Sequence, residues 1–140
     1  MLLEITRVYT METLRVKIEQ LEERIADGLE ELLPLLSELQ RMYRLASEEG
    51  ELEYEERFIV KYDPKVHSRI FSEKTVELLK ALAHGGFYSV SELARHLNRD
   101  VANVYRDVKT LEALGLVALV RRGKTVKPVL LAKRICLRYG

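Results

Sequence analysis

The sequence predicts a mainly helical chain with a small β hairpin, which is an α+β fold. Apolar residues recur at alternating steps of four and three over residues 11–46, the spacing of a helix that packs along one side. From Ser72 onward, short helical patterns with clear caps are followed by two strand-like runs. These patterns divide the chain into a helical region at 1–50, a strand with a connector at 51–71, and a compact region at 72–140.

The heptad pattern begins after Thr10, a suitable helix N-cap, and predicts a region that joins two copies of the chain. Extra leucines widen the apolar stripe, so a dimerising helical hairpin or bundle fits the pattern as well as a simple coiled coil does. Packing within one chain is the less favoured alternative. Pro34 removes a backbone donor inside the pattern, so we expect a kink or a break there. The predicted dimer contacts are Leu14, Ile18, Leu21, Ile25, Leu32, Leu35, Leu39 and Met42.

The β-prone residues 57–62, which end at Asp63-Pro64, predict a single strand. Its partner is either the strand-like segment 2–9 or the same segment of a second subunit.

Three short helices are predicted after this strand. Ser72 caps the first, Ser89 with Glu92 forms a capping box for the second, and Asp100 caps the third, which spans residues 100–114. The residues expected to face the core are Val76, Leu79 and Leu82 in the first helix, Leu93, Ala94 and Leu97 in the second, and Val101, Val104, Val108 and Leu111 in the third.

The helices are followed by strand-like residues 116–120 and 128–132, which flank a basic segment at 121–127. Ala94 is small enough to let the second helix approach the third, and Asn98 can adopt the left-handed turn conformation between them. Three helices with this tight turn, then a hairpin with a basic tip, outline a winged helix-turn-helix.

The charge is unevenly distributed although the net charge of the chain is only +1. Residues 1–72 contain 10 Lys/Arg and 16 Asp/Glu, a net −6, whereas residues 73–140 contain 13 and 6, a net +7. The basic half is therefore the candidate DNA-binding part.

On a helical wheel, the outward face of the third helix is basic and uncrowded. Arg can contact guanine and Asn can contact adenine through two hydrogen bonds each, so we expect Arg106 and Asn103 to read bases. Asp107 is expected to pair with a nearby Arg. The predicted DNA-binding residues are Ser89, Ser91, Arg99, Ala102, Asn103, Tyr105, Arg106, Lys109, Thr110, Arg121, Arg122, Lys124 and Lys127.

The run from Arg99 to Val117, RDVANVYRDVKTLEALGLV, resembles the signature stretch of a family of small predicted helix-turn-helix transcriptional regulators of archaea and bacteria. The segment 89–97 and the tail from Lys127-Pro128 onward are similar to that family too. From Ser72 onward the chain is also distantly similar to regulators of the multiple-antibiotic-resistance type. The resemblance implies DNA binding at Asn103, Arg106 and the wing.

These features predict a dimeric, sequence-specific regulator that binds double-stranded DNA. The alternatives are a protein-interaction module, which uses the winged helix as a scaffold and docks a toxin or a transcription-machinery component through the acidic helix, and a non-specific chromatin protein. An enzyme is not expected, because no phosphate-binding glycine loop or catalytic motif is present.

Composition excludes further classes of protein. No apolar run approaches 18 residues and no signal peptide is recognisable, so we expect a cytoplasmic protein without membrane contact. Cys136 is the only cysteine, so no internal disulfide or cysteine-based zinc site can form, and we expect neither metal nor cofactor. The scarcity of Asn and Gln beside 32% charged residues is typical of a thermophile. The resemblance to the regulator family implies an archaeal source.

Overall fold

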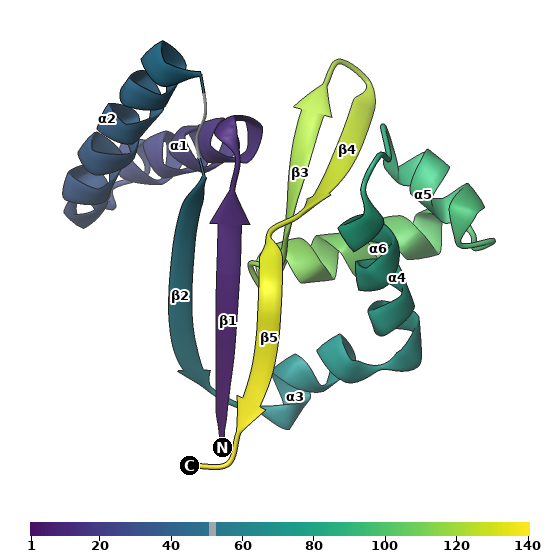
Figure 1. Cartoon of the computed structure of the whole chain (residues 1–140). Coiled ribbons are helices and arrows are strands. Elements are labelled where there is room, and N and C mark those ends of the chain that lie inside the picture. Colours follow the sequence, from purple (N-terminus) through teal and green to yellow (C-terminus); the bar gives the residue numbers. More distant parts are fainter. Residues whose placement is uncertain (51–52) are drawn as a thin grey trace. The chain divides into compact units, whose positions relative to one another are not determined.

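The computed structural model describes residues 1–50 and 53–140, and the fold is α+β with small antiparallel sheets (Figure 1). Residues 51 and 52, the start of the predicted connector, lie outside the described residues. The elements in chain order are β1 (Leu2–Tyr9), α1 (Met11–Ala26), η1 (Glu30–Leu32), α2 (Leu33–Glu49), β2 (Tyr54–Lys61), α3 (Pro64–His67), η2 (Ser68–Phe71), α4 (Glu73–His84), α5 (Val90–His96), α6 (Val101–Ala113), β3 (Val117–Arg122), β4 (Thr125–Leu130) and β5 (Ala132–Arg138).

The chain divides into two compact units, which are described separately. The first, residues 1–7 and 56–140, contains 18 Lys/Arg and 9 Asp/Glu and is called the basic unit. The second, residues 8–55, contains 5 Lys/Arg and 13 Asp/Glu and is called the hairpin unit. Their net charges are therefore +9 and −8, so the charge separation is sharper than the division at residue 72 predicted.

The predicted strand at 57–62 is β2, which begins earlier, at Tyr54, and ends at Lys61. Its partner is β1, which lies between β2 and β5 in a three-stranded sheet (Figure 1). The antiparallel register of β1 and β5 aligns Ile5 with Ile135. Of the two partners that the sequence allowed for this strand, the structure therefore contains the segment 2–9 of the same chain.

The β3–β4 hairpin is longer than predicted. Pairing continues to Arg122 and Thr125, so the strands meet at a two-residue turn formed by Gly123 and Lys124. The expectation of a basic loop at 121–127 is therefore wrong in its extent: Arg121, Arg122 and Lys127 lie on strands, and Lys124 alone of the four predicted contacts lies in the turn. The cause is β-prone sequence on both sides of Gly123, whose positive φ of 60° suits a tight turn.

The three helices begin and end close to the predicted residues. The side chains of Ser72 and Ser89 accept hydrogen bonds from the backbone N–H groups of Thr75 and Glu92. Asn98 has the expected positive φ, 52°, in the turn between α5 and α6. Asp100 occupies the N-cap position of α6, but its side chain makes no capping hydrogen bond, which corrects the prediction.

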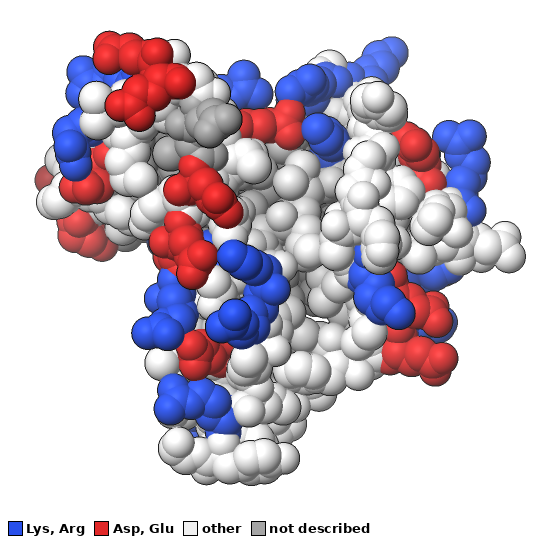
Figure 2. All heavy atoms as spheres, viewed as in Figure 1, with Lys and Arg blue, Asp and Glu red and all other residues white. Residues whose placement is uncertain are grey.

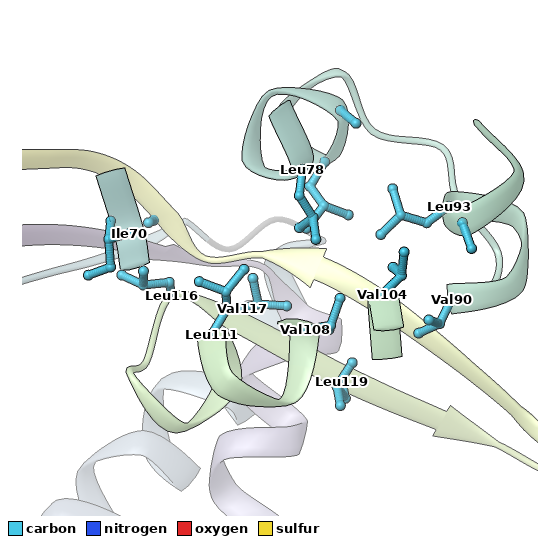
Figure 3. Packing of buried hydrophobic residues seen from close by; sticks show 14 of the residues in the cluster. Ile70, Leu78, Val90, Leu93, Val104, Val108, Leu111, Leu116, Val117 and Leu119 are labelled. Atoms are coloured by element: carbon cyan, nitrogen blue, oxygen red, sulfur yellow. The ribbon is translucent and has the colours of Figure 1, made fainter. Parts of the chain in front are cut away.

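The core of the basic unit is formed by one side of each helix together with β1 and β3. Figure 3 shows Val104 and Val108 of α6 among side chains of α4, α5 and β3, and both residues are fully buried. Val101 is 44% exposed because it opens the helix at the surface, before the buried stripe begins. Its predicted burial is wrong.

A second correction concerns α4, where Val76 was expected in the core and is 41% exposed. The buried stripe of α4 runs through Thr75, Leu78, Ala81 and Leu82 instead. Leu78 and Leu79 are neighbours, so two apolar stripes one residue apart are both compatible with a helical period. Packing against the rest of the core selects the stripe centred on Leu78.

The heptad segment of the hairpin unit is two helices, which is the hairpin alternative that the sequence left open. The first helix ends at Ala26, and Gly28 has a φ of 108°, which an L side chain rarely adopts. The break therefore lies ahead of Pro34, which occupies the first turn of α2, where proline is tolerated.

The α1 and α2 helices pack on each other as a hairpin (Figure 1). Many of the predicted dimer contacts are buried or half-buried within the single chain. Leu14, Ile18, Leu21 and Leu39 are buried, Ile25, Leu32 and Met42 are half-buried, and Leu35 is exposed. The leucines that remain exposed on the hairpin are Leu29, Leu33, Leu35 and Leu45.

Within residues 1–50 and 53–140, no helix combines the length and the apolar character needed to cross a membrane. The same residues contain no cluster of three or more His, Cys, Asp or Glu side chains suited to hold a metal ion.

Candidate nucleic-acid interface

The outward face of α6 is the candidate contact surface. Because successive helical residues are separated by about 100°, burying Val104, Val108 and Leu111 turns the intervening positions outward. The predicted contacts Ala102, Asn103, Tyr105, Arg106 and Lys109 are all exposed. The wheel drawn from the sequence thus agrees with the structure except at Val101, which is exposed, and Thr110, which is half-buried.

Asn103 and Arg106 lie side by side on this face. The Arg106 Nη1 donates to Asn103 Oδ1 at 3.5 Å, which is at the long limit of a hydrogen bond. A contact this weak leaves both groups available to other partners while it keeps them adjacent.

Two neighbouring polar side chains on α6, those of Lys109 and Thr110, have closer partners within the chain. The Lys109 ammonium is 3.0 Å from Glu112 Oε1, and the Thr110 hydroxyl donates to the Arg106 carbonyl at 3.1 Å. Thr110 is also half-buried. Of the predicted α6 contacts, Lys109 and Thr110 therefore already have partners in the folded chain.

Arg99 lies in the turn before α6 and is held more tightly than a surface contact would be. Its Nη2 donates to Asp107 Oδ2 at 2.6 Å, and the two side chains are only 20% and 29% exposed. This is the pairing expected for Asp107. The other terminal nitrogen of Arg99, Nη1, is buried and has no acceptor among the described residues.

The serines of α5 differ in their surroundings. Ser89 accepts from the Glu92 N–H at 3.1 Å, as predicted for a capping box. Glu92 Oε2 accepts from the N–H of Tyr88, one residue before the cap, rather than from Ser89. Ser91 is exposed in the first turn of the helix.

Cations also lie along the β3–β4 hairpin, which packs against α6 through β3. Arg121, Arg122 and Lys124 are exposed, and Lys127 is half-buried. Figure 2 shows the charge distribution, with carboxylates gathered over α1–α2 and basic side chains at the tip of the β3–β4 hairpin.

A polar cleft between α4 and α6 was not anticipated from the sequence. Its volume is about 560 Å³. Its lining residues come from η2, the first turn of α4, the α5–α6 turn and the first half of α6: Arg69, Ser72, Lys74, Thr75, Arg99, Asp100, Asn103, Arg106 and Asp107. The signal that could have revealed it is a pair of cations, Arg69 and Lys74, on either side of the helix cap at Ser72.

Residues 70–137 match the sequence model of a protein family described as HVO_A0114, so this part of the chain is similar to that family. The matched range covers α4, α5, α6 and the β3–β4 hairpin, together with most of β5, and leaves out the hairpin unit. No curated protein matches the chain.

Proposed function

We propose that α4, α5, α6 and the β3–β4 hairpin constitute a winged helix-turn-helix that binds double-stranded DNA, and that the protein regulates transcription, as the predicted regulators that its sequence resembles are expected to do. The observation that carries the proposal is the α6 surface, where Asn103 and Arg106 are exposed beside the small side chain of Ala102. A helix of this composition can approach base edges closely.

The chemistry of the two side chains supports base reading. Arg106 can donate two hydrogen bonds to guanine, and Asn103 can donate to and accept from adenine. Their 3.5 Å contact keeps them on one side of α6, so neighbouring base pairs are within reach of both. Cations of the β3–β4 hairpin, which would be the wing, add contacts to phosphates that depend strongly on salt.

A dimer is the second part of the proposal. Leu29, Leu33, Leu35 and Leu45 are exposed on the hairpin unit, and burial of such side chains against a second copy would be favourable. Two copies would place two α6 helices on a palindromic site, with half-site centres about 10 base pairs apart.

The test is selection of duplexes from a random library by the full chain, followed by titration of the selected site with Arg106→Ala. Loss of one bidentate base contact corresponds to about 1–3 kcal/mol, which is roughly a 5- to 150-fold loss of preference over random duplex. Arg57→Ala is the matched control, because Arg57 is an exposed arginine of β2 that lies outside the candidate surface.

Three results would contradict parts of the proposal. Equal preference in Arg106→Ala and the parent would remove the base-reading role of Arg106. A selection that returns no preferred sequence would indicate a general DNA-binding protein. Absence of binding to any duplex at low salt would favour the protein-interaction module, whose acidic docking surface would be the hairpin unit.

A further inference from the structure

The cleft between α4 and α6 has a charge balance that favours an anion. Its lining side chains include four cations, Arg69, Lys74, Arg99 and Arg106, and two carboxylates, Asp100 and Asp107. Asp107 is engaged by Arg99 at 2.6 Å, so one carboxylate charge is already compensated inside the wall. The first turn of α4 closes the cleft, and the positive end of a helix dipole also favours an anion there.

The cations of the cleft have unused donors. The side chains of Arg69 and Lys74 form no ion pair or hydrogen bond with the described residues, and both residues are exposed. Only the backbone carbonyl of Arg69 has a side-chain partner, the Ser72 hydroxyl, which donates to it at 2.9 Å. Arg99 has a buried Nη1 for which the described chain supplies no acceptor. A ligand rich in acceptor oxygens could accept hydrogen bonds from the exposed Arg69 and Lys74 side chains.

We propose that the α4–α6 cleft binds a phosphate group, and that this phosphate is part of the DNA backbone beside the groove that α6 reads. This inference rests on the proposed function. The DNA backbone is favoured over a free phosphate because Asn103 and Arg106 line the cleft and also form the base-reading face. A duplex that contacts those two side chains brings its backbone to the mouth of the cleft, where Arg69 and Lys74 fix the register without reading sequence.

The experiment measures the salt dependence of duplex binding for the full-length parent, Arg69→Gln and the Arg69→Gln/Lys74→Gln double variant. Each lost phosphate contact should lower the slope of log K against log salt by about 0.9. Affinity should fall by the same factor on the selected site and on random duplex. Lys61→Gln is the control, because Lys61 is an exposed lysine at the end of β2, outside the cleft, and its slope should equal that of the parent.

A parent that binds DNA together with a double variant of unchanged slope overturns the inference and leaves the proposed function intact. Folding is checked by the Tm of each variant, which should stay within about 1 °C of the parent because exposed charges contribute little to stability.

A parent that binds no duplex refutes the proposed function. The effect of inorganic phosphate on Tm then shows whether the cleft binds a free phosphate instead. A rise in Tm with phosphate in the parent, absent in the double variant and present in Lys61→Gln, assigns the cleft to a free phosphate. No rise in the parent overturns the phosphate site itself.

Discussion

The basic unit and the hairpin unit both contain amphipathic helices, yet they bury them differently. In the basic unit, α4, α5 and α6 pack with β1 and β3 around a single cluster in which Leu78, Leu93, Val104 and Val108 have no exposed surface. In the hairpin unit, two helices face each other, and several leucines stay exposed among many carboxylates. A helix pair has one shared side, so a wide apolar stripe cannot be fully covered within it.

The difference indicates a division of roles. The basic unit packs a large internal cluster but also leaves apolar side chains such as Ile59, Phe71 and Val76 exposed. What distinguishes it from the hairpin unit is its net charge of +9, which suits its outer surface to an anionic partner. The hairpin unit exposes several leucines, and exposed apolar side chains that lie together are typical of a surface that binds protein. Variants in each unit test this difference in packing and charge.

The largest expected effect is that of Leu93→Ala, which removes a fully buried side chain of α5. The cavity and the lost transfer free energy together should lower the free energy of unfolding by about 2–5 kcal/mol. Leu35→Ala, in the hairpin unit, removes a 37% exposed leucine and should change it by less than about 1 kcal/mol at low protein concentration. Urea unfolding followed by circular dichroism measures both. A cost for Leu35→Ala equal to that for Leu93→Ala would show that Leu35 is covered in solution, although it is 37% exposed in the folded chain.

Periodicity alone predicted the buried side of α6, but it did not predict the packing partner of the heptad segment. The pattern of α6 was sufficient to assign Val104, Val108 and Leu111 to the core, because punctuation at Asn98 and Gly115 fixed both ends of the helix. The heptads of the hairpin unit have the same period, and they could not reveal whether their partner is a second chain or the other half of the same segment. The residue that separates the two helices is Gly28, whose φ of 108° follows the end of α1 at Ala26.

The candidate site was predictable where a residue's role depends on one helix and not where it depends on packing between elements. Asn103 and Arg106 follow from the wheel of α6 alone. Arg69 lies more than 30 residues earlier in η2, and only the tertiary fold brings it to the same cleft. Arg99 was predicted as a DNA contact, and its burial against Asp107 depends on how the turn packs on α6.

A smaller effect is expected from Asp107→Ala, which removes the partner of Arg99. Both side chains are less than a third exposed, and the guanidinium would be left without a charged acceptor, so stability should fall by about 1–3 kcal/mol. Glu38→Ala removes the partner of Arg41 on the hairpin unit, where both side chains are more than half exposed, and should cost less than about 0.5 kcal/mol. The double variant Arg99→Ala/Asp107→Ala should lose less than the sum of its single variants, because neither charge is then left alone. Additive losses in this cycle would show that the two groups act independently.

The smallest of the three effects compares two glycines with positive φ at helix ends, Gly115 after α6 and Gly50 after α2. An alanine at either position adopts a left-handed conformation, at a cost of about 1–2 kcal/mol. At Gly50 the added methyl group meets nothing within 4 Å, whereas at Gly115 it would lie 2.6 Å from Arg7 Nη1.

The Arg7 side chain has little freedom to move away from such a methyl group. It forms an ion pair with Glu56, and its guanidinium lies 4.5 Å from the centre of the Phe58 ring. We therefore expect Gly115→Ala to lower stability by about 1 kcal/mol more than Gly50→Ala does, a difference comparable to a weakened cation–π contact. Arg7→Ala combined with Gly115→Ala should remove this excess, because the clash then has no partner. If the excess persists in the double variant, the cost at Gly115 comes from backbone conformation alone, and Arg7 does not constrain the junction between α6 and β3.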